Sequence, residues 1–392
     1  MKILYTSTAY LPSIGGAQLY LHQVVSCLSK QHVVRVVSLW DTNRTDWLLG
    51  TTLRLPDTPK AYCVDGVPVH QIGLSLFEKI RIIPFTFGYY FLKDLSIEVI
   101  SRQFEEKISQ FSHDIDIVHN IRIGREPLSY ASLKTARKSN VPFVFTPFHH
   151  PRWIGWNYTQ YHSLYKKADL VFALTNAEKR TLIGFGVHED RIVVTGHGPI
   201  LSNNSDPAGF LEKHDINGPV VLFLGQHYHY KGYKQLLSAA PLIWKQVPET
   251  HFIFIGPPVK NSERYFENLS DRRIHRLGTV NLREKTDALS ACTLLCVPST
   301  QESFGGVYTE AWNFSKPVIG CDIPAVSELI DDGVDGFLVS QDPIQISDGI
   351  CYLLLHSEER RNMGARGRNK VEKLYNKERI AQIVEDAYLN IA

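Results

Sequence analysis

Residues 298–312 read Pro-Ser-Thr-Gln-Glu-Ser-Phe-Gly-Gly-Val-Tyr-Thr-Glu-Ala-Trp. The apolar run 294–297 before them predicts a buried strand, and residues 307–314 have the pattern of a helix that begins after Gly305 and Gly306. The first amides of such a helix have no partner within it, and its dipole places partial positive charge beside them. We therefore expect an anion, such as a pyrophosphate, to approach the backbone closely at the two glycines.

Two carboxylates, Glu302 and Glu310, flank this loop. A carboxylate does not bind phosphate usefully, but it accepts hydrogen bonds from sugar hydroxyls. The stretch therefore suits a nucleotide-sugar, which carries hydroxyls on both sides of a diphosphate. On these residues alone a second interpretation stays open, in which the glycines only permit a tight bend and the carboxylates are solvated.

The run from Glu302 to Glu310 is followed by Lys-Pro-Val-Ile at 316–319 and by Glu-Leu-Ile-Asp-Asp-Gly-Val-Asp-Gly-Phe-Leu-Val at 328–339. Together these segments resemble the donor-binding half of glycosyltransferase family 4, the group 1 glycosyltransferases. The resemblance implies an α/β protein of GT-B fold, in which two Rossmann-like domains with doubly wound parallel sheets face a central cleft. It also implies a retaining, metal-independent transfer from a nucleotide-sugar.

Length and composition agree with two globular domains. The chain has 392 residues, more than one hydrophobic core usually serves, and 44% of them are hydrophobic. Its formal net charge of +2 gives no basic field, so we expect no nucleic-acid partner. Six cysteines are scattered without a disulfide framework, which fits a reducing cytoplasm. No apolar run reaches the roughly eighteen residues that a membrane span needs.

Short apolar strands alternate with helical patterns, which predicts parallel sheets with ligands at the carboxyl ends of the strands. The polar segment 202–207 interrupts this alternation. We therefore place an acceptor-side domain at 1–204 and a donor-binding domain at 205–374, and the resemblance implies that a last helix at about 375–392 packs back on the first domain. The strands are predicted at 3–7, 33–39, 115–119, 143–146, 170–174, 192–195, 220–224, 251–255, 273–277, 293–297, 317–320 and 336–339.

The loop after the first predicted strand contains Gly15 and Gly16 and opens a helix over 17–28. It lacks the spacing of a dinucleotide fingerprint, so by itself it is compatible with a mere tight turn. In the resembled family this loop faces the interdomain cleft near the donor phosphate and the acceptor. Both glycines are therefore candidates for donor binding.

The strand predicted at 143–146 is followed by His149 and His150. Members of the resembled family often carry a histidine here that reaches the donor sugar or the acceptor. If the chain stays extended beyond the strand, successive residues point in opposite directions and His149 faces the cleft. We prefer His149 on that ground, while packed or surface histidines without a role remain the alternative.

The turn after the first strand of the second domain reads Gly-Gln-His-Tyr-His-Tyr-Lys-Gly at 225–232. The resembled family usually carries an arginine after the first glycine and a Lys-Gly pair further on, and the two cations clamp the diphosphate. Lys231 matches this pattern, but Gln226 stands where the arginine is expected. We expect another cation to replace it. The candidates are His227, His229 and Arg152.

The histidines also suggest a rival hypothesis, a zinc site built from His149, His150, His197, His227 and His229. No carboxylate-rich histidine motif accompanies them, so we expect no metal and no other cofactor.

Residues 74–93 combine apolar and aromatic side chains with Lys79, Arg81 and Lys93, a composition also found where proteins rest on lipid. Pro84 argues against one continuous helix. We expect a pair of core helices with an acceptor-facing loop, and we keep peripheral membrane contact through this segment as the alternative.

The resemblance gives each candidate a role. Glu310 holds the ribose hydroxyls, Lys231 the diphosphate, and Glu302 the sugar hydroxyls or the developing positive charge. The catalytic candidates are His149, Lys231 and Glu302. The donor-binding candidates are Gly15, Gly16, Gln226, Lys231, Val280, Glu302, Phe304, Gly305, Gly306, Val307 and Glu310.

We thus predict a cytoplasmic hexosyltransferase, soluble or peripheral on the inner face of the membrane. It would move a hexose from UDP-glucose or a similar donor to a saccharide or lipid-linked saccharide in polysaccharide or glycolipid synthesis. Two alternatives stay open: a nucleotide-sugar epimerase or hydrolase, and a nucleotide-sugar-binding protein without transfer activity.

Overall fold

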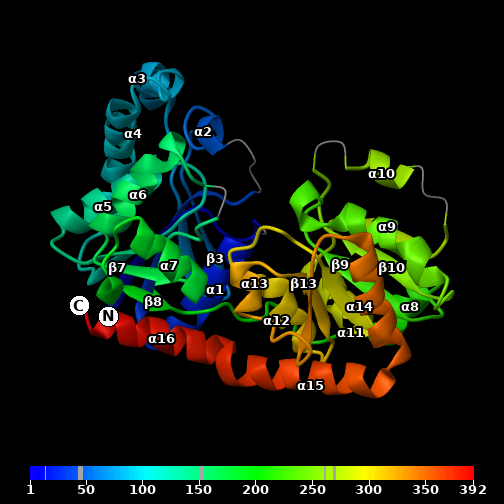
Figure 1. Cartoon of the computed structure of the whole chain (residues 1–392). Helices are drawn as coiled ribbons and strands as arrows, with labels where there is room; N and C mark the ends of the chain where they lie inside the picture. The colour runs from blue at the N-terminus through cyan, green and yellow to red at the C-terminus, as the bar shows by residue number, and fades with distance from the viewer. Residues whose placement is uncertain (14, 43–46, 151–152, 260–261, 268–270) are drawn as a thin grey trace. The chain divides into compact units, whose positions relative to one another are not determined.

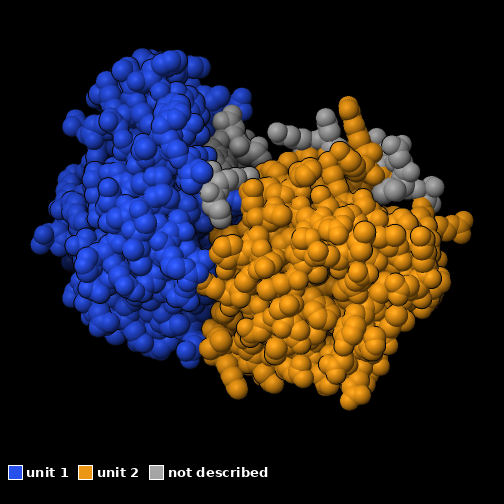
Figure 2. Space-filling view, in the orientation of Figure 1, with its two compact units in different colours: residues 1–196, 377–392 blue, residues 197–376 orange. Residues whose placement is uncertain are grey.

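The computed structural model describes the chain except residues 14, 43–46, 151–152, 260–261 and 268–270. Its internal contacts divide it into two compact units, which Figure 2 colours separately. Unit 1 comprises Met1–Gly196 and Lys377–Ala392, and unit 2 comprises His197–Asn376. The polar segment 202–207, at which we placed the boundary, lies within unit 2.

Unit 1 is built on an eight-stranded sheet with the strand order β3-β4-β2-β1-β5-β6-β7-β8. All neighbouring strands are parallel except β3 and β4. The central strands are almost wholly buried, as expected of a parallel sheet that helices cover on both faces. The strands are β1 (Lys2–Ala9), β2 (Val33–Trp40), β3 (Lys60–Val64), β4 (Val67–Gln71), β5 (Ile117–Ile121), β6 (Phe143–Thr146), β7 (Leu170–Ala173) and β8 (Ile192–Val194).

The hairpin of β3 and β4 was not among the predicted strands. Its two strands are joined by Asp65 and Gly66, which have φ angles of 49° and 82°. Positive φ at both central residues is the type I′ geometry that matches the twist of a two-residue hairpin, and Asp-Gly is a favoured sequence for it. The dipeptide was therefore a usable signal for an antiparallel edge that alternation with helices does not reveal.

The helices of unit 1 include α16, which packs against α1 and so fastens the end of the chain to this unit. The Tyr388 hydroxyl lies 2.9 Å from the Tyr5 hydroxyl on β1 and 2.5 Å from Nδ1 of His119 on β5. Burial lowers the pKa of His119 to about 3, so its imidazole is neutral. The helices are α1 (Gly16–Leu28), α2 (Trp47–Gly50), α3 (Leu76–Phe87), α4 (Lys93–Ile108), α5 (Pro127–Lys138), α6 (Thr159–Lys167), α7 (Asn176–Gly184) and α16 (Lys377–Leu389).

The segment 74–93 differs from our expectation of two core helices. It forms α3 and the turn before α4, and only Ile82 and Thr86 of α3 are buried. The other apolar side chains of α3 are exposed or partly exposed, so the core-helix prediction is wrong for α3. No helix in the described parts of the chain is both long enough and apolar enough to cross a membrane.

Unit 2 is built on a six-stranded, wholly parallel sheet with the order β11-β10-β9-β12-β13-β14. The strands are β9 (Val220–Leu224), β10 (His251–Ile255), β11 (Ile274–Gly278), β12 (Leu294–Val297), β13 (Val318–Cys321) and β14 (Gly336–Val339). The helices are α8 (Pro207–Lys213), α9 (Tyr233–Trp244), α10 (Arg264–Glu267), α11 (Leu282–Ala291), α12 (Gly306–Trp312), α13 (Pro324–Ser327), α14 (Pro343–Leu355) and α15 (Ser357–Leu374). Figure 1 labels most of these elements. The predicted strands are all present, close to their predicted bounds.

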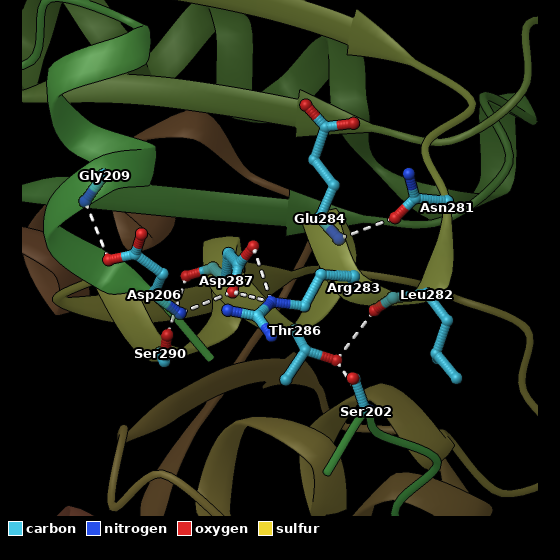
Figure 3. Close-up of polar contacts among 10 residues, drawn as sticks. All are labelled: Ser202, Asp206, Gly209, Asn281, Leu282, Arg283, Glu284, Thr286, Asp287 and Ser290. Atoms are coloured by element: carbon cyan, nitrogen blue, oxygen red, sulfur yellow. Dashed lines mark hydrogen bonds and ion pairs between the residues drawn. The ribbon is translucent and has the colours of Figure 1, made fainter. Parts of the chain in front are cut away.

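The polar segment after residue 201 is held by α11 rather than hanging free, as Figure 3 shows. The backbone amide of Ser202 donates to the Thr286 hydroxyl at 2.9 Å, and that of Asp206 donates to Oδ1 of Asp287 at 2.6 Å. Asp206 in turn caps α8 by accepting from the amide of Gly209 at 3.0 Å. The segment therefore caps α8 through the Asp206 side chain and is bound to α11 through its backbone amides.

Candidate functional site

The site of unit 2 follows from its strand order, which reverses between β9 and β12. These two strands pair in the middle of the sheet, with Leu295 opposite Leu222. In open α/β sheets ligands bind outside the carboxyl ends of the strands at such a point. The loop after β9 carries Gln226 and Lys231, and the loop after β12 carries Glu302. Residues far apart in sequence are therefore neighbours here.

Lys231 and Glu302 form an ion pair across these two loops. Nζ of Lys231 lies 2.5 Å from Oε1 of Glu302, and both side chains are largely buried. Removing one partner of such a pair leaves a buried charge without compensation. The sequence placed the two residues at different parts of the donor, whereas the structure brings them into contact. An entering diphosphate would compete with Glu302 for the ammonium group.

The two loops are held at a fixed spacing by backbone contacts. Gly232 has a φ of 81°, and a Cβ atom there would lie 2.4 Å from the carbonyl oxygen of Pro298. Nε2 of Gln341, just after β14, donates to the carbonyl oxygens of Tyr230 at 2.7 Å and Pro298 at 2.6 Å. Gln341 therefore joins the loop of Lys231 to the loop of Glu302. Gln341 was not predicted from the sequence, although ligands bind beyond the carboxyl ends of strands and this residue lies in the loop after β14.

Gly305 and Gly306 are required by packing as well as by conformation. Gly305 precedes α12 with a φ of 94°, and a Cβ atom there would lie 2.6 Å from the ring of Tyr308. The Tyr308 hydroxyl donates to the carbonyl oxygen of Val297 at 2.7 Å, which ties the start of α12 to β12. A Cβ atom on Gly306 would meet the ring of His197 at 3.2 Å. The close packing of the Tyr308 and His197 rings therefore leaves little room for a side chain at either glycine.

Phe304 and Val307 surround this glycine pair. The Phe304 ring is buried, and its centroid lies 5.9 Å from that of His197 in a stacked arrangement. Val307 is partly exposed in the first turn of α12. Val280 is also partly exposed, two residues after β11. Phe304 therefore serves the packing of the loop, while the donor contacts predicted for all three residues stay predictions.

Glu310 lies one turn inside α12 and is paired with Lys285 of α11. Nζ of Lys285 lies 2.6 Å from Oε1 of Glu310 and also donates to the carbonyl oxygen of Ile200 at 2.7 Å. Oε2 of Glu310 is buried and has no hydrogen-bond partner among the described residues. One oxygen is thus fixed by the protein, and the other can accept a hydrogen bond from a ligand. No local motif marks Lys285, because it lies on a separate helix.

His227 does not supply the cation that Gln226 lacks. Its ring is 1% exposed and packs against the rings of Tyr233 and Phe266, with centroid distances of 5.2 and 5.3 Å. Burial, reinforced by the charge of Arg276, lowers the pKa of His227 to about 4. The imidazole is therefore neutral near pH 7, and our expectation for it is wrong.

The other two candidate cations are placed differently. His229 is exposed in the short 3-10 helix η4 (His229–Lys231), beside Lys231. Arg152 lies outside the described residues. Gln226 itself is exposed. His229 is thus the remaining candidate that the structure describes.

The site loops of unit 1 lie where its own strand order reverses, between β1 and β5. Gly15 precedes α1 in an extended conformation, and a Cβ atom there would lie 2.5 Å from Oε1 of Gln18. Gly16 is the first residue of α1 and is exposed. Both glycines therefore lie beyond the carboxyl end of β1, where α/β sheets commonly bind ligands, and their donor contacts stay predictions.

His149 is buried in unit 1, with 4% of its surface exposed. The premise of an extended chain beyond β6 does not hold, because Phe148 has a φ of 46°. The backbone amide of His149 donates to Oε1 of Glu178 at 2.6 Å, and Nδ1 lies 3.2 Å from the Tyr165 hydroxyl. Burial, with a smaller contribution from Arg122, lowers the pKa of His149 to about 3. A neutral imidazole can exchange hydrogen bonds with a sugar, and that role stays a prediction.

An aromatic cage holds Arg122, which follows β5 directly. Its guanidinium carbon lies 3.8 Å from the ring centroid of Trp153 and 3.6 Å from that of Tyr161. Nη1 donates to the Tyr165 hydroxyl at 3.0 Å, so Arg122 and His149 share a partner. This buried cation is stabilised by cation–π contacts. Its place in the loop after β5 was not singled out from the sequence.

Metal binding finds no support in the arrangement of side chains. In the described ranges, no group of three or more His, Cys, Asp or Glu side chains is placed to hold a metal ion. The stacking of His227 within the core of unit 2 also removes it from the imagined zinc cluster.

Two family models match separate parts of the chain. The model described as "Glycosyl transferase 4-like domain" matches residues 15–198, and "Glycosyl transferases group 1" matches residues 210–370. Spore coat protein SA of Bacillus subtilis is 25% identical over 413 residues, which cover 99% of both chains. Phosphatidyl-myo-inositol mannosyltransferase of Mycobacterium tuberculosis is 28% identical over 192 residues, which cover 47% of this chain. That match spans only half of the mannosyltransferase, 50% of its length.

Solved structures resemble the whole chain. HepE of Anabaena, in complex with UDP and glucose, superimposes with a TM-score of 0.75 at 20% identity, covering 98% of both chains. Sucrose-phosphate synthase of Thermosynechococcus elongatus gives a TM-score of 0.73 at 17% identity, covering 100% of this chain and 99% of that one. These likenesses show the GT-B fold, as predicted. The two family models, which together match residues 15–198 and 210–370, show that the chain belongs to the group 1 glycosyltransferases of family 4.

Proposed function

We propose that this glycosyltransferase moves a hexose from a UDP-sugar to a hydroxyl of a saccharide or lipid-linked saccharide, with retention and without a metal ion. The observation that carries the proposal is the buried Lys231–Glu302 pair at the strand-order reversal of unit 2. Two proteins similar to this chain support it. HepE has been solved with UDP-glucose, and a relative is named as acting on phosphatidyl-myo-inositol, which is a lipid-linked acceptor.

Each side chain has a distinct task in this proposal. Lys231 turns from Glu302 to the diphosphate, and Glu302 then accepts hydrogen bonds from the sugar or faces its developing positive charge. Oε2 of Glu310 accepts from the ribose hydroxyls, because Oε1 is already held by Lys285. The neutral His149 exchanges hydrogen bonds with the sugar.

The bond from the anomeric carbon to the diphosphate breaks as the acceptor oxygen bonds to the same face of that carbon. The acceptor proton passes to the departing diphosphate, so that the products are a glycoside and UDP. We assign neither Glu302 nor Glu310 as a covalent nucleophile, and the rate gain is attributed to positioning and charge stabilisation.

The first experiment is a thermal-shift screen of UDP-, GDP- and ADP-linked hexoses. A ligand at about 100 times its dissociation constant stabilises the folded protein by about 2.7 kcal/mol. We expect UDP-glucose or a similar UDP-hexose to give the largest shift. NMR of the product should then show the donor's anomeric configuration, and chelation should leave the rate unchanged. Inversion, or a rate abolished by chelation and restored by one metal, would contradict the proposal.

A second candidate is a nucleotide-sugar-binding protein without transfer activity, favoured by the neutral, exposed Gln226. In that case Gln226→Arg would create or strongly raise transfer, whereas a competent enzyme should change little. Incubation with donor alone separates both from an epimerase or hydrolase, which needs no acceptor.

We also propose a reducing, cytoplasmic location. All six cysteines are free thiols, and four of them, Cys292, Cys296, Cys321 and Cys351, are buried. Cysteines of this kind behave as small apolar core residues.

A further inference from the structure

Helix α3 turns its apolar side chains outward. Its inward contacts are limited to Ile82 and Thr86, which lie four residues apart on one narrow stripe. The exposed fractions reach 75% for Phe77, 69% for Phe87 and 90% for Phe91 in the turn before α4. We call the following residues the α3 patch: Leu76, Phe77, Ile80, Phe87, Phe91 and Leu92. A contiguous exposed patch of this kind marks an interaction surface.

The patch is built firmly into unit 1. Ser75 and Glu78 form a complete capping box at the start of α3, so the helix has a defined beginning. α3 packs against α4, and the two helices form one end of unit 1 (Figure 1). Lys93 at the start of α4 donates to the carbonyl oxygen of Trp156 at 3.2 Å, and this tryptophan is itself 61% exposed. The apolar surface therefore extends from α3 to the loop at Trp156.

The charges around the patch are cationic and interleaved with aromatic rings. Arg81 is exposed on α3 and has no hydrogen bond or ion pair with any described residue. Nζ of Lys93 lies 5.5 Å from the ring centroid of Trp156, and Arg125 donates to the Tyr90 hydroxyl at 3.2 Å.

The nearby carboxylates already have partners. Glu78 lies 2.8 Å from Nζ of Lys107, Asp94 accepts from Gln160, and Glu126 accepts from Tyr89. The Glu78–Lys107 and Lys79–Asp57 pairs cancel in formal charge, whereas Gln160 and Tyr89 are neutral donors. The three cations Arg81, Lys93 and Arg125 then outnumber the two carboxylates Asp94 and Glu126 by one formal charge, which complements an anionic partner.

We propose that the α3 patch docks the protein on an anionic lipid bilayer, with α3 lying along the interface. Exposed Phe, Leu and Trp beside Lys and Arg are the composition of interfacial helices, and a bilayer accepts projecting side chains without a complementary groove. A proline within α3, Pro84, does not oppose this, because α3 need not span the membrane. The inference stands independently of the proposed sugar transfer.

Vesicle flotation of the full-length protein tests the apolar part. With vesicles of phosphatidylglycerol and phosphatidylcholine, the wild type should float with the lipid. The combined variant Phe77→Ser, Phe87→Ser and Phe91→Ser should lose at least about tenfold in partitioning. Its matched control combines Val334→Ser, Ile344→Ser and Leu355→Ser, three exposed apolar residues of unit 2, and should float as the wild type does. All six side chains are exposed, so melting temperatures should barely change.

The contribution of positive charge is tested with Arg81→Gln. The control is Arg361→Gln, because Arg361 is an exposed arginine of unit 2. One arginine near an anionic surface is worth about a fivefold change in partitioning. Arg81→Gln should show that loss on phosphatidylglycerol vesicles and little change on pure phosphatidylcholine. The proposal is overturned if the wild type does not float, or if both triple variants lose binding equally. It is also overturned if light scattering shows a dimer that only the α3 variant disrupts while vesicle binding is absent.

Discussion

The two units offer the same topological position with opposite chemistry. Each sheet reverses its strand order between two paired central strands, β1 and β5 in unit 1 and β9 and β12 in unit 2. In unit 2 the loops and helices there carry two ion pairs, Lys231–Glu302 and Lys285–Glu310. In unit 1 the loop after β5 begins with Arg122, enclosed by rings and sharing Tyr165 with a neutral His149.

The difference shows what the fold decides and what the side chains decide. Strand order brings loops together, but only the residue types determine whether the place holds exchangeable charge. A lysine paired with a glutamate can exchange the carboxylate for a phosphate, because both anions accept hydrogen bonds from the lysine ammonium group. The guanidinium of Arg122 is held by the rings of Trp153 and Tyr161. It therefore keeps a fixed position and provides a positive charge that does not change partners. Unit 2 is therefore the unit suited to binding an anionic donor.

The largest expected effect comes from Lys231→Ala. The variant removes the proposed diphosphate donor and leaves Glu302 buried without its partner. Loss of a comparable electrostatic donor lowers rates by about 100- to 1000-fold, and we expect that loss in single-turnover transfer with saturating donor. Lys234→Ala is the control, because Lys234 lies nearby on α9 over the ring of Tyr265. Equal rates for the two variants would remove Lys231 from the reaction.

Glu310→Gln should come next, with its effect on binding rather than on the chemical step. A hydrogen bond to a charged group is worth about 1.5–3 kcal/mol, which corresponds to about 10- to 150-fold in the dissociation constant. Calorimetry with UDP measures it, and a melting curve checks the fold, since Lys285 loses its charged partner. If a folded Glu310→Gln protein bound UDP as the wild type does, the ribose would have to be held elsewhere.

Much of this architecture could be predicted because apolar strands and punctuating glycines are local signals. Apart from β3 and β4, the strands of both sheets were located from such runs. The β3–β4 hairpin was missed because alternation with helices does not mark it, although Asp65-Gly66 does. Helix α3 was misjudged because an apolar helix looks the same in sequence whether it faces a core or an outside surface.

The site was predictable only where its residues share one stretch of chain. Glu302, Gly305, Gly306 and Glu310 lie within one motif, so their proximity follows from the sequence itself. Lys285 and Gln341 act through contacts between elements, and no spacing announces such contacts. The charge of His227 could not be predicted for a related reason, since it depends on burial against rings from other elements.

Gly305→Ala should have a smaller effect, on stability. An alanine there would adopt an unfavourable positive φ and overlap the ring of Tyr308. Gly333 is a matched control, because its φ is 73° and a Cβ atom there meets nothing within 4 Å. The backbone term alone costs about 1–2 kcal/mol, so Gly333→Ala should lose about that much and Gly305→Ala more. Urea unfolding compares them, and equal losses would show that the Tyr308 contact relaxes freely.

The smallest effect at neutral pH is expected for His227→Phe. The ring packs against Tyr233 and Phe266, and neither ring nitrogen has a hydrogen-bond partner among the described residues. A phenylalanine of similar volume should therefore fit within about 1.5 kcal/mol of the wild type at pH 7. His149→Phe in unit 1 is the comparison, because it also removes the contact with Tyr165 and should be the more destabilising variant at pH 7.

Acid should separate His227→Phe from the wild type. The pKa of His227 is about 4 in the folded protein and about 6.5 for an unperturbed histidine, so the unfolded chain binds the proton more readily between these pH values. The free energy of unfolding of the wild type is therefore unaffected by this histidine above pH 6.5, and it decreases as the pH falls toward 4. Phenylalanine has no proton to bind, so His227→Phe should gain on the wild type steadily over this window in urea unfolding. A constant difference from pH 7 to pH 4 would mean that folding does not lower the pKa of His227, and its exclusion as the cation missing at Gln226 would then lose its basis.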